Sequence, residues 1–260
     1  MKRIKKILYH STLIIIFILL VYSSINVITN KYYQKEYNKV NEFIIPVEQN
    51  SNTNSINNKD NISTNTTTIS KPTTSSPKTL EDYRKVHNNN DIVGKISIPN
   101  TNLSMLLTQT TNNTYYLDHL VNKEYNKLGS TFVDYRTNLN TSKKINIYGH
   151  NNGKNSVSFN LLTNYLDKTY YEQHKLIKIE TNNNIETYEI FSIQITNNNN
   201  HMQVSFTDIE WYLHLEDIIN NSIYTTNTSI DDITKMITLQ TCTNINDNEF
   251  LLIHGRKIAN

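Results

Sequence analysis

The sequence predicts a mainly β domain of about 170 residues, either a β-barrel or a β-sandwich with a few inserted helices, preceded by an N-terminal transmembrane helix. Three observations lead to this prediction. Short β-rich segments recur between polar turns from about residue 91 to the end of the chain. A strongly apolar segment lies near the N-terminus, and a polar stretch without aromatic residues separates it from the β-rich part.

The apolar segment, residues 7–28, has the centre LIIIFILLVY at residues 13–22. At a rise of 1.5 Å per residue it would span about 33 Å as a helix, which is enough to cross a bilayer. The basic residues of segment 1–6 precede it, and no A-x-A cleavage site follows it. These features favour a retained signal-anchor with segment 1–6 in the cytoplasm. A cleaved signal peptide and a buried core helix are the alternatives.

The charge of the chain is concentrated at its N-terminus. The net charge is +2, yet residues 1–30 hold four basic and no acidic residues, so the remainder has a net charge of −2. A mildly acidic exported domain does not indicate nucleic-acid binding. The single cysteine excludes an intramolecular disulfide framework and any multi-cysteine zinc or iron–sulfur site.

Residues 29–87 read as an extracytoplasmic connection between the anchor and the domain. Residues 31–43 are polar with scattered aromatics and are compatible with a short helix. Residues 49–77 contain too few apolar groups to offset the entropy lost on ordering, so we expect a flexible tether. The folded domain is then expected over residues 88–260.

Within this domain, eight segments have the composition and length of strands. Residues 159–174 predict one or two short helices, and residues 208–220 predict a helix with Asp208 as its N-cap. The predicted strands are residues 92–98, 105–109, 131–135, 144–148, 176–180, 185–195, 235–241 and 250–258.

Cys242 and His150 are the first candidates for chemistry. Cys242 closes the predicted strand at 235–241, where a side chain can be both held and reached, although a lone cysteine is often only a small core residue. A thiolate nucleophile needs a nearby base or cation. Among eight histidines, His150 follows a predicted strand through a glycine (INIYGHNN), which provides access.

Acyl transfer also needs a group that stabilises the developing oxyanion. Arginines are few. Arg136 ends a predicted strand and Arg256 lies near the end of the last one, and surface ion pairing is the alternative role for both.

Together these segments resemble the sortases, and most closely class B sortases, which are membrane-anchored cysteine transpeptidases of Gram-positive bacteria. The resemblance rests on two motifs: TLQTC at residues 238–242, which is close to the family's TLxTC, and YGHN at residues 148–151. Supporting stretches are residues 91–101, 113–119, 129–136 and the terminal IHGRKI, and the helix at 208–220 favours class B.

The resemblance implies a closed eight-stranded sortase-type barrel with added helices. It implies that Cys242 attacks an NPxTx-like sorting signal of a surface protein after its threonine and forms a thioester, while His150 transfers protons. The acceptor would be an amine of a peptidoglycan precursor or cross-bridge. The chemistry needs no metal and no organic cofactor. Gln240 and Thr241, beside Cys242, would contact the substrate.

The chain departs from the family where sortases place an arginine at the start of the last strand. Here Phe250 stands at that position, and Arg256 lies six residues further on, about 20 Å away along a strand. Arg256 is the first candidate to replace the arginine, and Arg136, or Asn246 with Asn248, are the others.

Because the expected arginine is not at position 250, two alternative functions stay open. One is a catalytically impaired homologue that binds sorting signals or wall components. The other is a secreted cysteine hydrolase without an amine acceptor.

Overall fold

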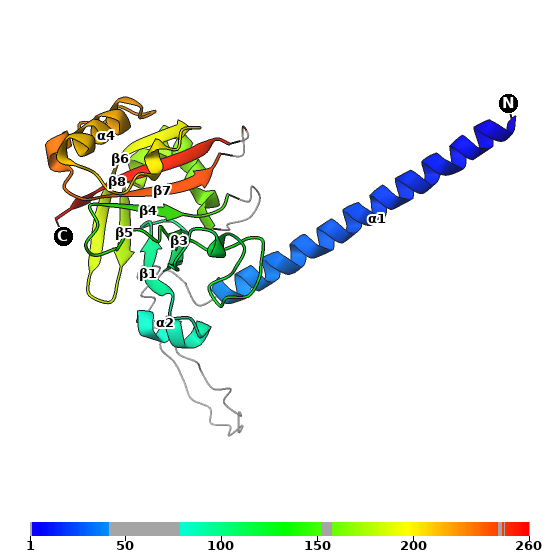
Figure 1. Ribbon diagram of the computed structural model, residues 1–260, viewed down its shortest axis with the longest axis horizontal. Coiled ribbons are helices and arrows are strands. Elements are labelled where there is room, and N and C mark those ends of the chain that lie inside the picture. Colours follow the sequence, from blue (N-terminus) through cyan, green and yellow to red (C-terminus); the bar gives the residue numbers. More distant parts are fainter. Residues whose placement is uncertain (1, 42–78, 152–157, 244–245, 247, 260) are drawn as a thin grey trace, which may run out of the picture.

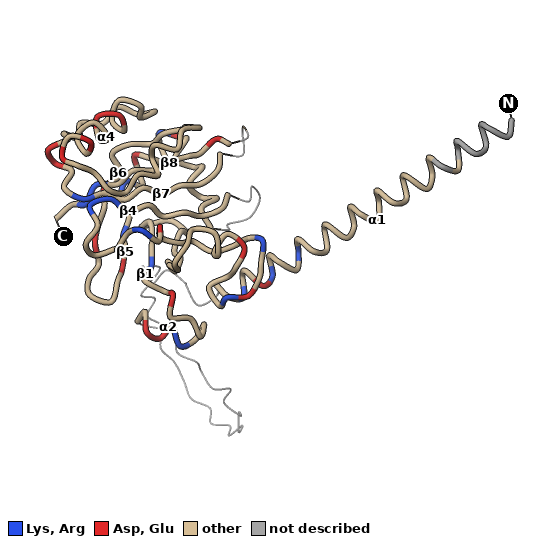
Figure 2. The backbone as a smooth tube through the Cα atoms, viewed as in Figure 1, with Lys and Arg blue, Asp and Glu red and all other residues tan. Residues whose placement is uncertain are grey.

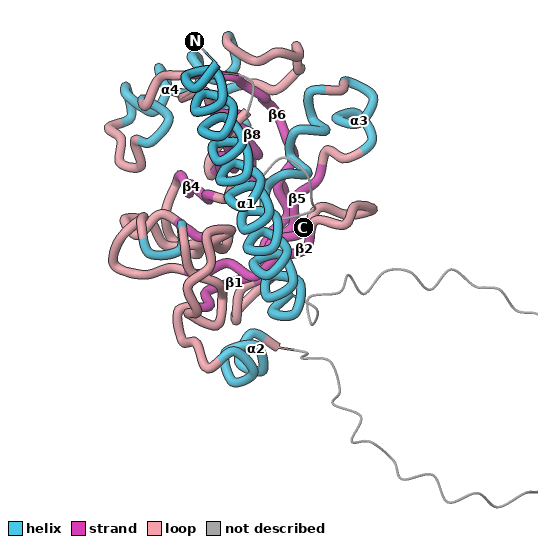
Figure 3. The backbone as a smooth tube through the Cα atoms, turned by 90° about the vertical axis from the view of Figure 1, so that its right-hand side faces the viewer, coloured by secondary structure: helices cyan, strands magenta, loops and turns pink. Residues whose placement is uncertain are grey.

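The computed structural model describes residues 2–41, 79–151, 158–243, 246 and 248–259. Helix α1, Lys2–Asn41, projects away from the folded domain and only its last turns lie against it (Figures 1 and 3). Among the described residues, one helix is long and apolar enough to cross a membrane, over Thr12–Asn41. The short helix expected at 31–43 is the continuation of α1 as far as Asn41. The expected tether at 49–77 lies outside the described residues.

Eight strands close into a barrel, in agreement with the predicted fold. The order around the barrel is β1-β2-β3-β4-β7-β8-β6-β5, and antiparallel pairing of β5 with β1 closes it. The pairs β2–β3 and β4–β7 are parallel, and the others are antiparallel. The strands are β1 Ile92–Ser97, β2 Ser104–Thr108, β3 Phe132–Val133, β4 Lys144–Tyr148, β5 Leu176–Glu180, β6 Ile185–Thr196, β7 Met236–Cys242 and β8 Phe250–Ile258.

The barrel core follows from the strand patterns. β1 alternates buried and half-buried residues, as a strand with one face toward the core does, whereas all five residues of β4 are buried. Ile147, Leu239 and Ile253 lie on the three adjacent central strands and are fully buried. Each such side chain contributes about 1.5–3 kcal/mol through removal of apolar surface from water.

Strand β3 is shorter than the predicted strand at 131–135. The chain turns at Asp134, because the backbone N–H of Thr137 donates to the Asp134 carbonyl over 3.0 Å. The Asp134 carboxylate binds Arg136 and Tyr148 instead of facing solvent. The turn therefore leaves only Phe132–Val133 in the sheet.

Helices cover parts of the barrel. The segment predicted to be helical at 159–174 forms the 3-10 helix η2, Ser158–Leu166, and α3, Lys168–Gln173. Short 3-10 turns are η1 Tyr115–Leu117, η3 Asn200–Met202 and η4 Ile230–Asp232.

Helix α4, Asp208–Asn220, has the predicted bounds, but its N-cap is Thr207 rather than Asp208. The Thr207 hydroxyl accepts from the Glu210 backbone N–H, and the Glu210 carboxylate accepts in return from the Thr207 backbone, which is a capping box. Trp211 and Leu215 lie on the apolar side of α4 and pack against the barrel.

Helix α2, Leu80–His87, was not predicted from the sequence. Thr79 and Asp82 form a capping box at its start, and Leu80 and Tyr83 are buried. The packed part of the domain therefore begins before the expected boundary at residue 88.

Basic residues gather at the end of β8 near the C-terminus (Figure 2). Glu186 accepts from Lys235 at 2.7 Å and from Lys257 at 2.6 Å, and Arg256 pairs with Glu189 at 2.6 Å. Burial alone would raise the pKa of Glu186, but the hydrogen bonds from both lysines outweigh it and lower the pKa to about 2. We call these five residues the ion-pair end of the barrel.

Candidate active site

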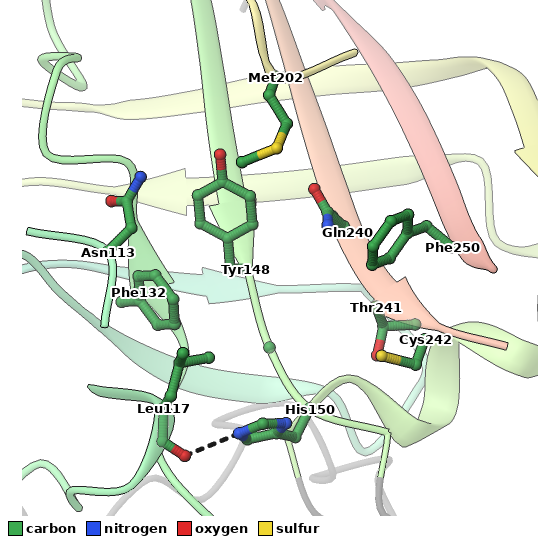
Figure 4. Close-up of a pocket in the computed structure, with 11 residues that line it drawn as sticks. Asn113, Leu117, Phe132, Tyr148, His150, Met202, Gln240, Thr241, Cys242 and Phe250 are labelled. Atoms are coloured by element: carbon green, nitrogen blue, oxygen red, sulfur yellow. Dashed lines mark hydrogen bonds between the residues drawn. The ribbon is translucent and has the colours of Figure 1, made fainter. Parts of the chain in front are cut away.

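Two parallel strands bring Cys242 and His150 to the same level at the other end of the barrel. β4 pairs with β7 so that Tyr148 lies opposite Gln240, and the Gly149 N–H donates to the Gln240 carbonyl over 3.1 Å. Two residues beyond this pair, the chains reach His150 and Cys242. The two candidates therefore lie on neighbouring segments at the edge of one pocket (Figure 4).

Gly149 and Asn151 fix the backbone around His150. A Cβ atom at position 149 would lie 2.8 Å from the ring of Phe159, so a residue with a side chain does not fit. The Phe159 N–H donates to the His150 carbonyl over 3.0 Å, and the Asn151 amide donates to the Cys242 carbonyl over 2.8 Å. The histidine segment is thereby tied to β7 and to the start of η2.

A pocket of about 220 Å³ opens beside this pair. Its described lining contains no lysine, arginine, aspartate or glutamate, and mostly apolar walls with a few polar groups are typical of ligand sites. The lining residues are Asn113, Leu117, Phe132, Tyr148, Gly149, His150, Met202, Gln240, Thr241, Cys242 and Phe250.

Cys242 is accessible and uncharged at rest. The residue is exposed, but partial desolvation of its sulfur raises the pKa of the thiol. The neutral thiol therefore predominates at neutral pH, and an attack on a substrate carbonyl requires a base to remove the proton.

The imidazole of His150 is oriented by the loop on the opposite wall. Its Nε2 lies 2.7 Å from the Leu117 carbonyl oxygen. A carbonyl only accepts hydrogen bonds, so Nε2 carries a hydrogen and donates. In the neutral ring Nδ1 is then the basic nitrogen, on the side of the ring away from Leu117 (Figure 4).

Gln240 reaches into the pocket and is held by His201. Burial lowers the pKa of His201, so its ring is neutral. The His201 Nδ1 lies 2.6 Å from the Asn198 carbonyl oxygen, and its Nε2 lies 2.8 Å from the Gln240 side-chain oxygen Oε1. The Gln240 side-chain oxygen therefore faces His201, and the NH₂ group of the same amide is left for a ligand of the pocket (Figure 4).

Two basic side chains donate hydrogen bonds to the backbone of the turn η3, which carries His201 and Met202. Lys144 donates to the His201 carbonyl at 2.5 Å, and burial lowers the pKa of Lys144 to about 7. Arg136 donates to the Met202 carbonyl at 2.8 Å. These contacts fix one end wall of the pocket.

Arg136 also binds Asp134, at 2.7 Å, and the Tyr148 hydroxyl donates to the same carboxylate at 2.7 Å. Burial would raise the pKa of Asp134, but these hydrogen bonds lower it. Arg136 is therefore engaged in an ion pair behind the pocket wall and does not line the pocket.

The structure brings together four of the five predicted site residues: Cys242, His150, Gln240 and Thr241 all line the pocket. The Thr241 hydroxyl is buried and has no hydrogen-bond partner among the described residues.

Arg256 is not brought to the site. It lies opposite Met236 in the β7–β8 register, six residues from Phe250, and pairs with Glu189. Phe250 itself lies directly opposite Cys242. Asn246, another candidate donor, is hydrogen-bonded to the Glu249 carboxylate.

Sequence reasoning missed several lining residues. Leu117 and Met202 come from short 3-10 turns and Asn113 comes from a loop, and the position of each depends on contacts distant in sequence. Residues 113–119 were noted for their resemblance, which was the one available signal for that wall. Among the described residues, no group of three or more His, Cys, Asp or Glu side chains is arranged to hold a metal ion.

Comparison with known proteins gives one consistent family. A family model described as "Sortase domain" matches residues 96–258. Sortase B of Listeria monocytogenes is 33% identical over 187 residues, which cover 69% of this chain and 74% of that protein.

Two solved structures extend the likeness to the fold. A Staphylococcus aureus sortase B–substrate complex has a TM-score of 0.61 at 26% identity, covering 69% of this chain and 86% of that one. A sortase B complexed with triglycine has a TM-score of 0.62 at 26% identity, with the same two coverages.

Proposed function

This chain belongs to the sortase family of cysteine transpeptidases, as a class B sortase, and we propose that it joins a surface protein covalently to a peptidoglycan amine through a thioester on Cys242. The observation that carries the proposal is the β4–β7 register, which sets His150 level with Cys242 at an open, apolar pocket. The substrate would be an NPxTx-like sorting signal, cleaved after its threonine.

In the first step the Cys242 sulfur attacks the carbonyl carbon of the threonine while His150 Nδ1 takes the thiol proton. The carbon–nitrogen bond then breaks, and His150 returns the proton to the leaving amine. The products are an acyl thioester on Cys242 and a free C-terminal fragment.

In the second step an amine of a peptidoglycan precursor or cross-bridge attacks the thioester carbonyl. His150 takes a proton from the attacking nitrogen and returns it to sulfur as the carbon–sulfur bond breaks. The solved complexes of sortase B with substrate and with triglycine support both a peptide and an amine as ligands of this proposed site.

Gln240 and Thr241 would contact the peptide beside the scissile bond. The Gln240 NH₂ group offers donors, because its side-chain oxygen is engaged by His201, and the unpartnered Thr241 hydroxyl offers a donor and an acceptor. A buried hydroxyl without a partner gains a hydrogen bond when a peptide occupies the pocket.

We also propose that α1 anchors the chain in the cell membrane, with the barrel outside the cell. The apolar stretch within Thr12–Asn41 and the basic residues before it support this topology. A single-pass anchor would keep the enzyme beside membrane-held substrates.

One observation favours a second candidate, a catalytically impaired homologue that binds sorting signals. Phe250 occupies the place opposite Cys242, and Arg136 and Arg256 are both engaged in ion pairs away from the pocket. Without a cation, the developing oxyanion would depend on neutral donors of the pocket.

The test uses the full chain in detergent micelles with NPxTx and LPxTG peptides, with and without triglycine. Wild type should form a thioester on Cys242 and a triglycine-linked product. Cys242→Ala should abolish both, and His150→Ala should slow them by about 100-fold or more. His174→Ala, outside the described pocket lining, is the matched histidine control and should retain activity.

Each outcome assigns one function. Peptide binding without a thioester in wild type would establish the impaired homologue. A thioester that only water resolves, whatever amine is supplied, would establish a hydrolase. A His150→Ala variant as fast as wild type would remove His150 from the mechanism.

A further inference from the structure

The last turns of α1 are built into the folded domain. Tyr37 and Val40 are buried, with 6% and 7% of their surface exposed, and they join a cluster with Leu80 and Tyr83 of α2 and with Leu106 of β2. We call residues 30–40 the docking segment. A helix end buried in this way is part of the domain core rather than a free stalk.

The docking segment contacts the start of η2, directly behind the histidine. The Tyr37 hydroxyl accepts a hydrogen bond from the Ser158 backbone N–H over 2.7 Å. Ser158 has a positive φ of 50°, a conformation that a non-glycine residue keeps only where its surroundings hold it. The next N–H, of Phe159, donates to the His150 carbonyl.

The docking segment also contacts the loop that orients the imidazole. The Asn126 side chain donates to the Tyr33 carbonyl over 2.9 Å, and Lys127 contacts Asn30. The Asn126 backbone N–H donates in turn to the Asp118 carbonyl over 2.8 Å, one residue from Leu117. Leu117 supplies the carbonyl that receives the His150 Nε2 hydrogen bond.

We propose that the docking segment is a positioning element of the active site, and that Tyr37 is a positioning residue that acts on His150 through Ser158. One helix holds both structures that fix the histidine, the start of η2 and the loop of Leu117. The inference rests on the proposed function in that His150 transfers the protons.

The test compares Tyr37→Phe with Tyr32→Phe in the full chain in detergent micelles. Both changes remove one hydroxyl from the same helix, but Tyr32 is 59% exposed. In Tyr37→Phe the Ser158 N–H loses its partner while the ring stays packed. Amide exchange over residues 158–166 should then become about tenfold faster, with no change in the Tyr32→Phe control.

The kinetic readout separates positioning from binding. Tyr37→Phe should lower kcat by about tenfold with KM unchanged, because the peptide pocket is intact while the imidazole is less well held. Thermal unfolding of each variant shows whether the fold is preserved. A second variant, Asn126→Ser, removes the other contact and should lower kcat in the same way.

The exchange measurement decides the inference even if wild type cleaves no peptide, so failure of the proposed reaction remains distinguishable. Unchanged exchange over residues 158–166 in a folded Tyr37→Phe variant would overturn the contact. An effect on KM alone, or equal losses in Tyr37→Phe and Tyr32→Phe, would overturn the positioning role.

Discussion

Strands β7 and β8 carry a charged end and an uncharged end. At the ion-pair end Arg256 lies opposite Met236 and binds Glu189, while Glu186 accepts from two lysines. At the pocket end Cys242 lies opposite Phe250, and the described lining carries no charged residue. The same strand pair thus uses its charges for stability at one end, whereas at the other end no cation lines the described part of the pocket beside the thiol.

The largest effect is expected from a substitution that disrupts the ion-pair end. Glu186→Gln should lower the free energy of unfolding by about 3 kcal/mol at pH 7, because it removes a buried carboxylate and leaves two lysines without their partner. The folded-state pKa of about 2 lies below the ordinary value of 4.5. The stabilisation is therefore present above pH 4.5 and is lost as the pH falls toward 2.

Chemical denaturation of wild type and variant between about pH 7 and pH 2.5 measures this effect. The difference between the two proteins should shrink steadily below pH 4.5. At pH 7 and a temperature where both are folded, Cys242 should be alkylated at the same rate in each. A constant stability difference across the pH range would contradict the assignment.

An intermediate effect is expected from a substitution that introduces a positive charge at the pocket end. Phe250→Arg places a cation opposite Cys242, where it should lower the thiol pKa by about one unit and speed alkylation by iodoacetamide at pH 7 by about tenfold. In wild type, where desolvation raises the thiol pKa, the alkylation rate should keep rising above pH 9.

Phe250→Met is the neutral control and should keep the wild-type profile. If transfer to triglycine rises together with alkylation in Phe250→Arg, the lack of a positive charge at position 250 limits the transfer activity of the wild-type chain. If alkylation rises and transfer does not, the oxyanion is stabilised by another group.

The smallest effect is expected from Arg256→Gln. Its ion pair with Glu189 is partly exposed, so the loss of unfolding free energy should be about 1 kcal/mol or less. Thioester formation should be unchanged, because Arg256 lies at the opposite end of β8 from Phe250. A drop in thioester formation without a drop in stability would assign Arg256 to catalysis after all.

The sequence predicted the strands well because each carries its own β-rich pattern bounded by polar turns. It also indicated Cys242 and His150 as candidates, and two strand ends in parallel register place both at one pocket, while their catalytic roles stay a prediction. The shortened β3 and the N-cap of α4 depend on single side chains: the Asp134 carboxylate accepts from the Arg136 backbone N–H, and the Thr207 hydroxyl accepts from the Glu210 backbone N–H. Such local competition is not visible in hydrophobic patterning.

The rest of the pocket was out of reach for a different reason. Met202 reaches the pocket on a turn that Lys144 holds by binding the carbonyl of His201, 57 positions away, while Gln240 binds the His201 ring. Helix α2 was missed because it is only eight residues long and gains its stability from the core it joins. Tertiary contacts of this kind have no short-range sequence signal.

Helix α1 runs without a break from the proposed membrane span into the folded domain, so it fixes the distance between the membrane surface and the proposed active site. With residues 7–28 in the bilayer as we propose, Tyr37 lies nine residues, or about 14 Å, beyond the apolar edge. Because Tyr37 contacts the segment behind His150, the proposed catalytic pair, Cys242 and His150, would lie near that level. An extended peptide covers this distance in about four residues. A membrane-held substrate would therefore be cut only if its cleavage site emerges within a few residues of the lipid surface.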